Sequence, residues 1–340
     1  MSTSNPQRIF VHGSGAVSPA GWGALPLATA VQGRVSIPEF GLTGGAGFET
    51  RVRRVPIPAT RPPALQHPRL RRSSPVSQFA VSAALEALGT PPGSGTVSGD
   101  RLGIVCAVMG GGVTYSRRFF TEVLANPATA SPLLFPETVF NAPAAHLAAV
   151  LGATGPNVTL VGDQTGFLCG LAVAAEWLAA GQVDACLVVG TEEADWLTAR
   201  AWDLFRPTVP AAEGAGAILL CTEPSDIELH AITEPVLYRN LRSRRSAAVA
   251  AWEALPNTTD TDFLVDSADW EPHARQEGST PSVAPRQVLG EGFGAAGAWA
   301  CVAAVHAVAT GGAPQAAVRV AGSNLQAMAA RFGRPTTPVG

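Results

Sequence analysis

The stretch Gly155–Gly166, which reads Gly-Pro-Asn-Val-Thr-Leu-Val-Gly-Asp-Gln-Thr-Gly, decides how the rest of the chain is interpreted. An apolar run at 158–161 is followed by a turn of small residues and then by an Ala-rich segment. This pattern predicts a β-strand, a tight turn and an α-helix. Gln164 falls in the turn, where the unpaired N–H groups and the positive dipole end of the helix are expected.

The residue type at position 164 restricts the chemistry of this turn. A cysteine at a helix N-terminus is ionised easily and becomes a nucleophile. The amide of Gln164 donates and accepts hydrogen bonds but cannot form an acyl thioester. The turn therefore has the architecture of a nucleophile site without the nucleophile.

Further segments flank this turn in a fixed order. They are 8–21, 72–79, 131–147, 183–193, 206–220 and 290–298. Together they resemble the β-ketoacyl synthases of the thiolase superfamily. A Gln at the nucleophile position is similar to the chain-length factor, the ketosynthase beta subunit of type II polyketide and aryl polyene synthases. It also occurs in decarboxylating loading ketosynthases.

The resemblance implies an α/β fold of the thiolase type. Two similar α/β halves are expected in a five-layered α-β-α-β-α arrangement, with an N-terminal half at 1–226 and a shortened C-terminal half at 227–340. Strands are predicted near 8–12, 102–108, 157–161, 185–190, 216–221, 227–233, 262–266 and 316–321. Helices are predicted near 75–89, 116–125, 142–151, 166–180, 241–254 and 294–309. Continuous apolar strands alternating with helices favour largely buried sheets.

Composition limits the possible partners and reactions. The net charge of −3 argues against nucleic acid as a partner. All 23 basic residues are arginine, which excludes a Schiff-base lysine. The five cysteines form no Cys-x-x-Cys pair and are expected to be reduced, in a cytoplasmic protein. No membrane segment and no cofactor are expected.

The resemblance also implies where the catalytic residues of an active relative would fall. Active members use a Cys, two His and a Lys, and the matching positions here hold Gln164, Ala268, Glu291 and Arg286. The terminal loop with its gating aromatic is reduced to Ala321–Asn324. These positions are degenerate, so no catalytic residue is assigned. We expect that the chain cannot condense acyl chains by itself.

A chain-length-factor-like subunit needs partners. The resemblance implies a heterodimer with a Cys-containing ketosynthase, with 158–161 at the two-fold axis and Leu133–Asn141 crossing into the partner. Acyl carrier protein would bind to the heterodimer rather than to this chain alone. The candidates for the acyl tunnel or the interface are Tyr115, Phe119, Phe120, Phe135, Thr138 and Phe140.

Two other functions remain open at this stage. The first is a malonyl-carrier-protein decarboxylase that supplies starter units and uses Gln164 in place of Cys. The second is a homodimeric binding or scaffold protein. Smaller alternatives concern single residues: Cys169 as a relocated nucleophile, and Asp163 with Glu291 either as an acid–base pair or as a polar pair filling a dead site. His146 is expected to be a structural residue.

Overall fold

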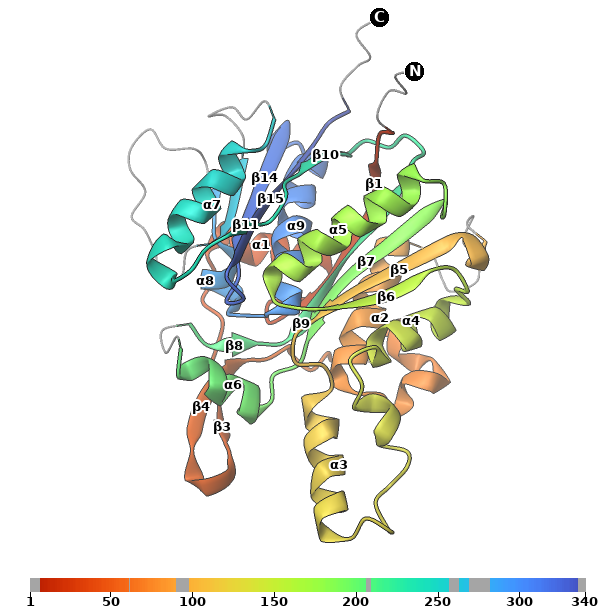
Figure 1. The fold of residues 1–340 in the computed structure, drawn as a ribbon, viewed down its shortest axis with the longest axis vertical. Helices are drawn as coiled ribbons and strands as arrows, with labels where there is room; N and C mark the ends of the chain where they lie inside the picture. The colour runs from red at the N-terminus through yellow and green to blue at the C-terminus, as the bar shows by residue number, and fades with distance from the viewer. Residues whose placement is uncertain are drawn as a thin grey trace, which may run out of the picture.

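The computed structural model describes residues 7–60, 62–89, 98–205, 209–256, 263–268 and 282–335. Figure 1 shows a layered α/β molecule in which the first and the last described residues lie at the same side. The main sheet joins two sets of five strands, and a small separate sheet lies below it.

The first set of strands comes from the N-terminal part of the chain. Its order is β6-β5-β7-β9-β1. The bounds are β1 Phe10–Ser18, β5 Leu102–Val108, β6 Asn157–Val161, β7 Ala185–Glu192 and β9 Gly214–Cys221. β5 is parallel to β6 and β7, whereas β9 is antiparallel to both β7 and β1. β6 ends the order, so it is an edge strand of the described sheet.

The second set repeats this topology strand for strand. Its order is β13-β12-β14-β15-β10, with β10 Glu228–Ile232, β12 Phe263–Ser267, β13 Ser282–Val283, β14 Gln315–Ala321 and β15 Gln326–Gly333. β12 is parallel to β13 and β14, and β15 is antiparallel to β14 and β10. The two sets meet where β1 pairs with β10, at Phe10 and Glu228. The prediction of two similar α/β halves is therefore confirmed at the level of topology; the domain boundary at 226/227 stays a prediction.

Helices cover both faces of each set. α2 (Pro75–Leu88) and α4 (Ala142–Leu151) pack on the outer face of the first set, and α7 (Arg244–Glu253) packs on β14 and β15. Between the sets lie α5 (Gln164–Ala179) and α9 (Gly294–Ala309), which contact each other and strands of both sets. α1 (Ala24–Gly33) and α8 (Pro285–Leu289) pack beside α9. This is the five-layered arrangement expected from the sequence.

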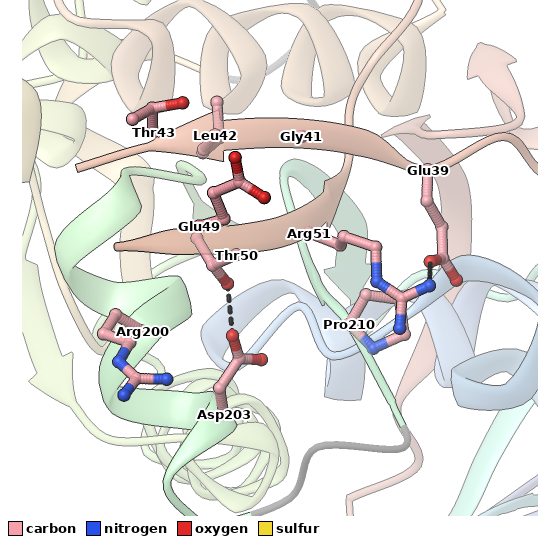
Figure 2. A pocket seen from close by; sticks show the side chains of 10 residues that line it. All are labelled: Glu39, Gly41, Leu42, Thr43, Glu49, Thr50, Arg51, Arg200, Asp203 and Pro210. Carbon is pink, nitrogen blue, oxygen red and sulfur yellow. Dashed lines mark hydrogen bonds and ion pairs between the residues drawn. The ribbon is translucent and has the colours of Figure 1, made fainter. Parts of the chain in front are cut away.

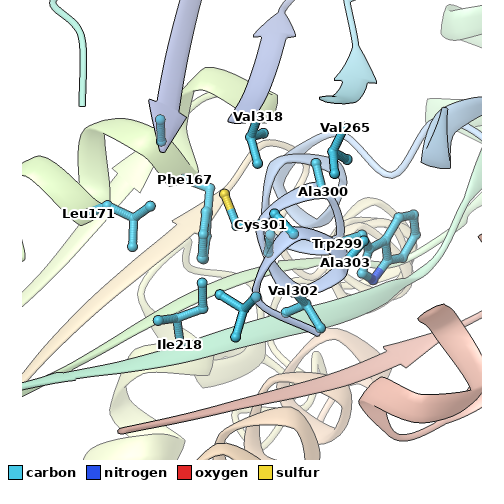
Figure 3. Packing of buried hydrophobic residues seen from close by; sticks show 14 of the residues in the cluster. Phe167, Leu171, Ile218, Val265, Trp299, Ala300, Cys301, Val302, Ala303 and Val318 are labelled. Carbon is cyan, nitrogen blue, oxygen red and sulfur yellow. The ribbon is translucent and has the colours of Figure 1, made fainter. Parts of the chain in front are cut away.

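The middle layer is the centre of the core, as Figure 3 shows. α9 reads Gly-Ala-Ala-Gly-Ala-Trp-Ala-Cys-Val-Ala-Ala-Val-His-Ala-Val-Ala, and nearly all of it is buried. Its small residues allow close approach: a Cβ at Gly297 would stand 2.2 Å from the carbonyl oxygen of Gln164. Phe167, Ile218 and Val318 fill the space around the helix from three other elements. The Gly/Ala pattern thus brings α9 against the first residue of α5.

Several elements were not predicted from the sequence. They are α1, α6 (Trp196–Asp203), α8, β15, the hairpin of β3 (Phe40–Thr43) and β4 (Glu49–Arg53), and the short strands β2 (Gly21–Trp22), β8 (Ala211–Ala212), β11 (Val236–Leu237) and β13. Some boundaries also differ from the prediction. β1 continues to Ser18, and α3 begins at Val113 and runs to Ala125. The 3₁₀ turns at Phe135–Glu137 (η5) and Leu241–Ser243 (η6) precede α4 and α7.

Within the described residues, no helix has both the length and the apolar character that crossing a membrane would require. All five cysteines are free thiols, as expected.

Candidate functional site

The turn between β6 and α5 forms as the sequence predicts. Asp163 is the N-cap of α5, and its carboxylate accepts a hydrogen bond from the Thr165 amide at 3.3 Å. Gln164 is the first residue of the helix and is completely buried. An Asp at the N-cap satisfies an otherwise unpaired helix N–H group. Gln164 therefore stands at the start of the helix, where the sequence predicts it, inside the protein rather than at its surface.

The side chain of Gln164 faces a buried ion pair. With its amide oxygen turned toward α8, Gln164 accepts hydrogen bonds from Nε of Arg286 at 3.2 Å and from Nη2 of the same guanidinium. Nη2 of Arg286 also lies 2.5 Å from Oε2 of Glu291. Both charged side chains are nearly inaccessible to solvent. The structure thus joins three of the four degenerate positions in one contact chain, Gln164–Arg286–Glu291.

The local backbone geometry fixes Glu291, the last member of this contact chain. Glu291 follows Gly290, which has φ 95° and ends α8. The backbone N–H of Glu291 donates to Pro210, and its carbonyl accepts from Ala212, at 2.8 Å each. Its carboxylate accepts from the Phe293 amide at 2.8 Å, and Phe293 itself has φ 45°, which is strained for a residue with a Cβ. The carboxylate is consequently held toward Arg286.

Two more charged groups lie near this contact chain, the buried guanidinium of Arg244 and the carboxylate of Asp163. Arg244 donates to the carbonyl of Ala321. Burial, followed by the charge of Arg286, lowers the pKa of Arg244, while Glu291 acts in the opposite direction. Burial raises the pKa of Glu291, and the charge of Arg286 counteracts this. Arginine remains protonated in proteins. The positive charges of the two guanidinium groups are therefore matched by the two nearby carboxylates, those of Glu291 and Asp163.

Asp163 holds the shortened terminal loop. Its carboxylate accepts from the Ser323 amide, from the Ser323 hydroxyl at 3.1 Å and from the Asn324 amide at 3.0 Å. A Cβ at Gly322 would stand 2.1 Å from the carboxylate oxygens, so only glycine fits there. Asp163 binds this loop while Glu291 binds Arg286. The two carboxylates are engaged separately, which supports the polar filling of a dead site over an acid–base pair.

The remaining candidates offer no replacement for the missing groups. Ala268 follows β12, is buried and lies in an apolar cluster with Tyr238 and Ala321. The thiol of Cys169 lies 3.5 Å from the sulfur of Met328. Burial raises the pKa of the Cys169 thiol, which keeps it protonated and a poor nucleophile. The geometry gives no support to Cys169 as a relocated nucleophile.

A cavity of about 370 Å³ opens beside the closed cluster. Its walls include Met109, Glu192, Trp202, Phe293 and Ser323, but not Gln164, Arg286 or Glu291. The rings of Trp202 and Phe293 meet edge to face, with centroids 5.5 Å apart. Glu192 accepts from the amides of Met109 and Gly110 at 3.0 Å each, and burial raises its pKa to about 8. Gln164 therefore has no face on this cavity.

A second feature is an excursion at 113–141, which comprises α3 (Val113–Ala125), the following loop, η5 and the turn before α4, and which projects from the body of the molecule in Figure 1. No side chain of α3 is buried. The excursion is tied at its base by Glu137, which accepts from the Ser74 amide at 2.7 Å and pairs with His146 at 2.6 Å. His146 is thus a buried, partnered residue, as expected. Burial acts to raise the pKa of Glu137, and the hydrogen bonds from His146 and Ser74 more than offset it.

The tunnel and interface candidates all lie on this excursion. Tyr115 donates to the Arg72 carbonyl at 2.9 Å, and Thr138 donates to the Phe135 carbonyl at 2.8 Å. The rings of Phe119 and Phe135 are 5.6 Å apart. Phe120, Phe135 and Phe140 are 62%, 55% and 46% exposed. Within this chain they form an outward apolar surface, so their role as tunnel wall stays a prediction.

A polar cavity of about 680 Å³ lies between the β3–β4 hairpin and α6, and Pro210, which accepts from the Glu291 amide, is one of its wall residues. Figure 2 shows Arg51 pairing with Glu39 and Thr50 donating to Asp203 across this cavity. In the part of the chain that the structure describes, no group of three or more His, Cys, Asp or Glu residues is placed to hold a metal ion.

Sequence reasoning missed Arg244, Tyr238 and the loop-binding role of Asp163. Tyr238 donates to the Gly322 carbonyl, and Arg244 to Ala321, so both support the terminal loop from the side of α7. The Asp163 N-cap is visible in the sequence as an Asp before a helix. No sequence signal indicated the contacts of Tyr238 and Arg244, because they join distant parts of the chain.

Comparisons with known proteins agree with this fold. Residues 64–225 match the model of the beta-ketoacyl synthase N-terminal domain. No curated protein is similar enough in sequence to count as a match. Three solved structures share the fold at low identity, and each is aligned over 97% of this chain and 100% of its own. They are the ishigamide ketosynthase/chain length factor (TM-score 0.76, 19% identity), the AntDE:AntF complex of a type II PKS acyl-carrier protein with its ketosynthase bound to the hexaketide (0.79, 15%), and a beta-ketoacyl synthase from Burkholderia phymatum STM815 (0.81, 14%).

The family resemblance and the fold class expected from the sequence are both confirmed. Residues 64–225 match the family model of the β-ketoacyl synthase N-terminal domain, and the described chain as a whole has the thiolase-like α/β fold that the similar ketosynthase and chain length factor structures share.

Proposed function

We propose that this chain is a chain-length-factor-like subunit that cannot condense acyl chains alone and pairs with a Cys-containing ketosynthase. The observation that carries the proposal is the contact chain Gln164–Arg286–Glu291. It places an amide where the nucleophile would stand and a guanidinium in front of it. A condensing site needs a nucleophile and oriented hydrogen-bond donors to a developing enolate. Here the N–H groups of Arg286 contact Gln164 and Glu291 instead.

The surface of the chain supports the pairing. β6 is an edge strand whose residues are only partly covered, and Val161 at its end is 60% exposed. The excursion adds Phe120, Leu133 and Phe135, all more than half exposed. A protein with an open strand edge and a broad apolar surface gains stability by covering both. A ketosynthase with the same fold would supply a matching edge strand.

Known complexes of the same fold motivate the choice of partner. One neighbour is described as a ketosynthase/chain length factor, and another as an acyl-carrier protein in complex with its ketosynthase. By analogy, the excursion would reach the acyl tunnel of the partner subunit, and acyl carrier protein would dock on the assembled pair. The decarboxylase alternative is less well supported, because Ala268 and Glu291 cannot act as the two His donors and Arg286 fills the space beside Gln164.

Co-expression with a ketosynthase encoded nearby, followed by size-exclusion chromatography, tests the pairing. The wild-type chain should co-elute with the ketosynthase, and Val161→Arg should weaken this because it places a charge at the covered strand edge. Leu25→Arg, at a side chain 64% exposed on α1, is the matched control and should leave co-elution intact. A wild-type chain that stays a stable monomer with every such ketosynthase would refute the proposal. A chain that forms only homodimers would favour the scaffold alternative.

A further inference from the structure

The excursion at 113–141 has little buried surface of its own. Among its residues, all of which the structure describes, only Leu134 and Glu137 are buried, and α3 contributes none. An exposed segment of this kind gains little from apolar burial, so its orientation depends on its polar contacts with the body of the molecule. Side chains of the excursion make such contacts at two places.

The first place is near the beginning of α3. Tyr115 donates to the Arg72 carbonyl at 2.9 Å, and Arg117 pairs with Asp195 at 2.9 Å. These contacts determine where the excursion starts. They do not hold its second half, 126–141, which returns to the body through a loop and η5.

The second place is Glu137, which uses both of its carboxylate oxygens. Oε2 accepts from the backbone amide of Ser74, the N-cap of α2, at 2.7 Å. Oε1 lies 2.6 Å from Nε2 of His146 on α4. The carboxylate therefore joins the excursion to two helices of the body, and it lies at the positive end of the α2 dipole.

The other side chains of the second half do not make such a connection. Among the described residues, the remaining side-chain hydrogen bonds of 126–141 stay within the excursion, as those of Thr129 and Thr138 do. The rings of Phe119 and Phe135, 5.6 Å apart, also join two parts of the excursion to each other. Glu137 is thus the polar side chain that connects the second half to the body.

We propose that Glu137 is the positioning residue of the excursion for partner binding. It lies in the chain between Phe135 and Phe140, which are 55% and 46% exposed. With both oxygens bonded to the body, Glu137 holds these rings in one orientation, whereas apolar contacts alone are not directional. The apolar surface is then already oriented before pairing, and less conformational freedom is lost on binding. This role rests on the proposed pairing with a ketosynthase, whereas the contacts of Glu137 belong to this chain alone.

Hydrogen–deuterium exchange of the chain alone measures how firmly the second half is held. The amides of Leu134, Glu137 and Thr138 are the reporters, because each donates a hydrogen bond in the structure. In Glu137→Ala we expect these amides to exchange at least about tenfold faster, because hydrogen bonds to a charged group are lost. Exchange in β5 and β7 should stay unchanged, which separates a local effect from a general loss of stability.

Two further variants sharpen this measurement. Glu137→Gln should behave like the wild type, because it has the same length, its oxygen accepts from Ser74 and its NH₂ group donates to the other tautomer of His146. Glu122→Ala is the matched control, since Glu122 also lies on the excursion but bonds only to Arg118 and Ser131 within it. It should leave the exchange of the Glu137 and Thr138 amides unchanged.

The second measurement is the Kd for a ketosynthase that co-elutes with the wild-type chain. Glu137→Ala should bind roughly tenfold more weakly or worse, because the competent orientation becomes one of several. Glu137→Gln and Glu122→Ala should bind like the wild type. If Glu137→Ala does not fold, Glu137→Asp takes its place, because it keeps the charge but is one methylene too short to reach both partners.

The outcomes distinguish this role from the proposed function. A wild-type chain that pairs with no ketosynthase overturns the proposed function and this role with it. A wild-type chain that pairs, together with a Glu137→Ala variant that pairs as tightly, overturns only the role of Glu137. Unchanged exchange of the reporter amides, or equal acceleration throughout the chain, also overturns it.

Discussion

Arg286 lies between Gln164 and Glu291, with its Nη2 2.5 Å from Oε2 of the carboxylate. In this arrangement one guanidinium ties together the two positions that the family resemblance matches to a nucleophile and to a histidine. The contact chain is buried, and within it one guanidinium is paired with one carboxylate. The centre is therefore a packed structural element rather than an empty pocket.

The ion pair should behave as a coupled unit in stability measurements. Arg286→Met leaves the carboxylate of Glu291 buried without its partner, and we expect a loss of about 3–5 kcal/mol in the free energy of unfolding. Glu291→Leu should cost a similar amount. The double variant should be more stable than either single variant, because no uncompensated charge remains. Urea unfolding of the wild type, the two single variants and the double variant measures these free energies. If the loss in the double variant equals the sum of the two single losses, the pair is not coupled.

Restoring a thiol should not restore chemistry. Gln164→Cys places a cysteine at the start of α5, beside Arg286, where its thiolate is favoured. The thiol would still be buried and separated from the neighbouring cavity, and no histidine stands at 268 or 291. We expect no acyl adduct by intact-protein mass spectrometry after incubation with acyl and malonyl carrier proteins. A stoichiometric adduct on this variant would mean that the cluster opens readily in solution.

Stability should decrease as pH rises through the neutral range. Burial raises the pKa of Glu192 to about 8 and that of Glu193 to about 7, from an ordinary value of 4.5. Between 4.5 and these values the folded chain binds more protons than the unfolded chain, so each group removes up to about 1.4 kcal/mol of stability per pH unit. The Tm should be highest near about pH 5 and fall toward about pH 8.5. A flat or rising Tm over this range would contradict the two shifts.

The length of the product should respond to the excursion. If this chain walls the tunnel of its partner, Phe140→Ala should lengthen the product, because removing the ring frees space for roughly one more extension unit. Phe119→Ala is the second choice. Phe40→Ala on β3 is a matched control, since Phe40 is 47% exposed and Phe140 is 46% exposed. The measurement is the product length made by each reconstituted complex, after the folding of each variant has been checked. Unchanged products for both excursion variants, in complexes that form and turn over, would leave only a supporting role for this chain.

Much of the fold could be predicted because most elements have strong local patterns. β5, β6, β7, β9 and α9 are continuous apolar or Ala-rich segments, and their positions agree with the prediction. β15 was missed because Gln326–Gly333 is rich in Ala and has little strand propensity of its own. It is a strand because β14 and β10 pair with it on both sides. α6 and the β3–β4 hairpin were missed for a similar reason, since tertiary packing decides their conformation.

The sequence by itself determined the absence of a cysteine at position 164, the Asp163 cap, the order of the family segments and therefore the fold. Only the tertiary structure decided what replaces the lost chemistry. Arg286 reaches Gln164 because Gly297 lets α9 pack against α5 and because Gly290 turns the chain back toward Glu291. Glu137 bridges α2 and α4 because these helices pack against each other at the base of the excursion. Local composition determines which segments become helices and strands. Contacts between distant segments depend on how the layers pack, and no local sequence pattern indicates that packing.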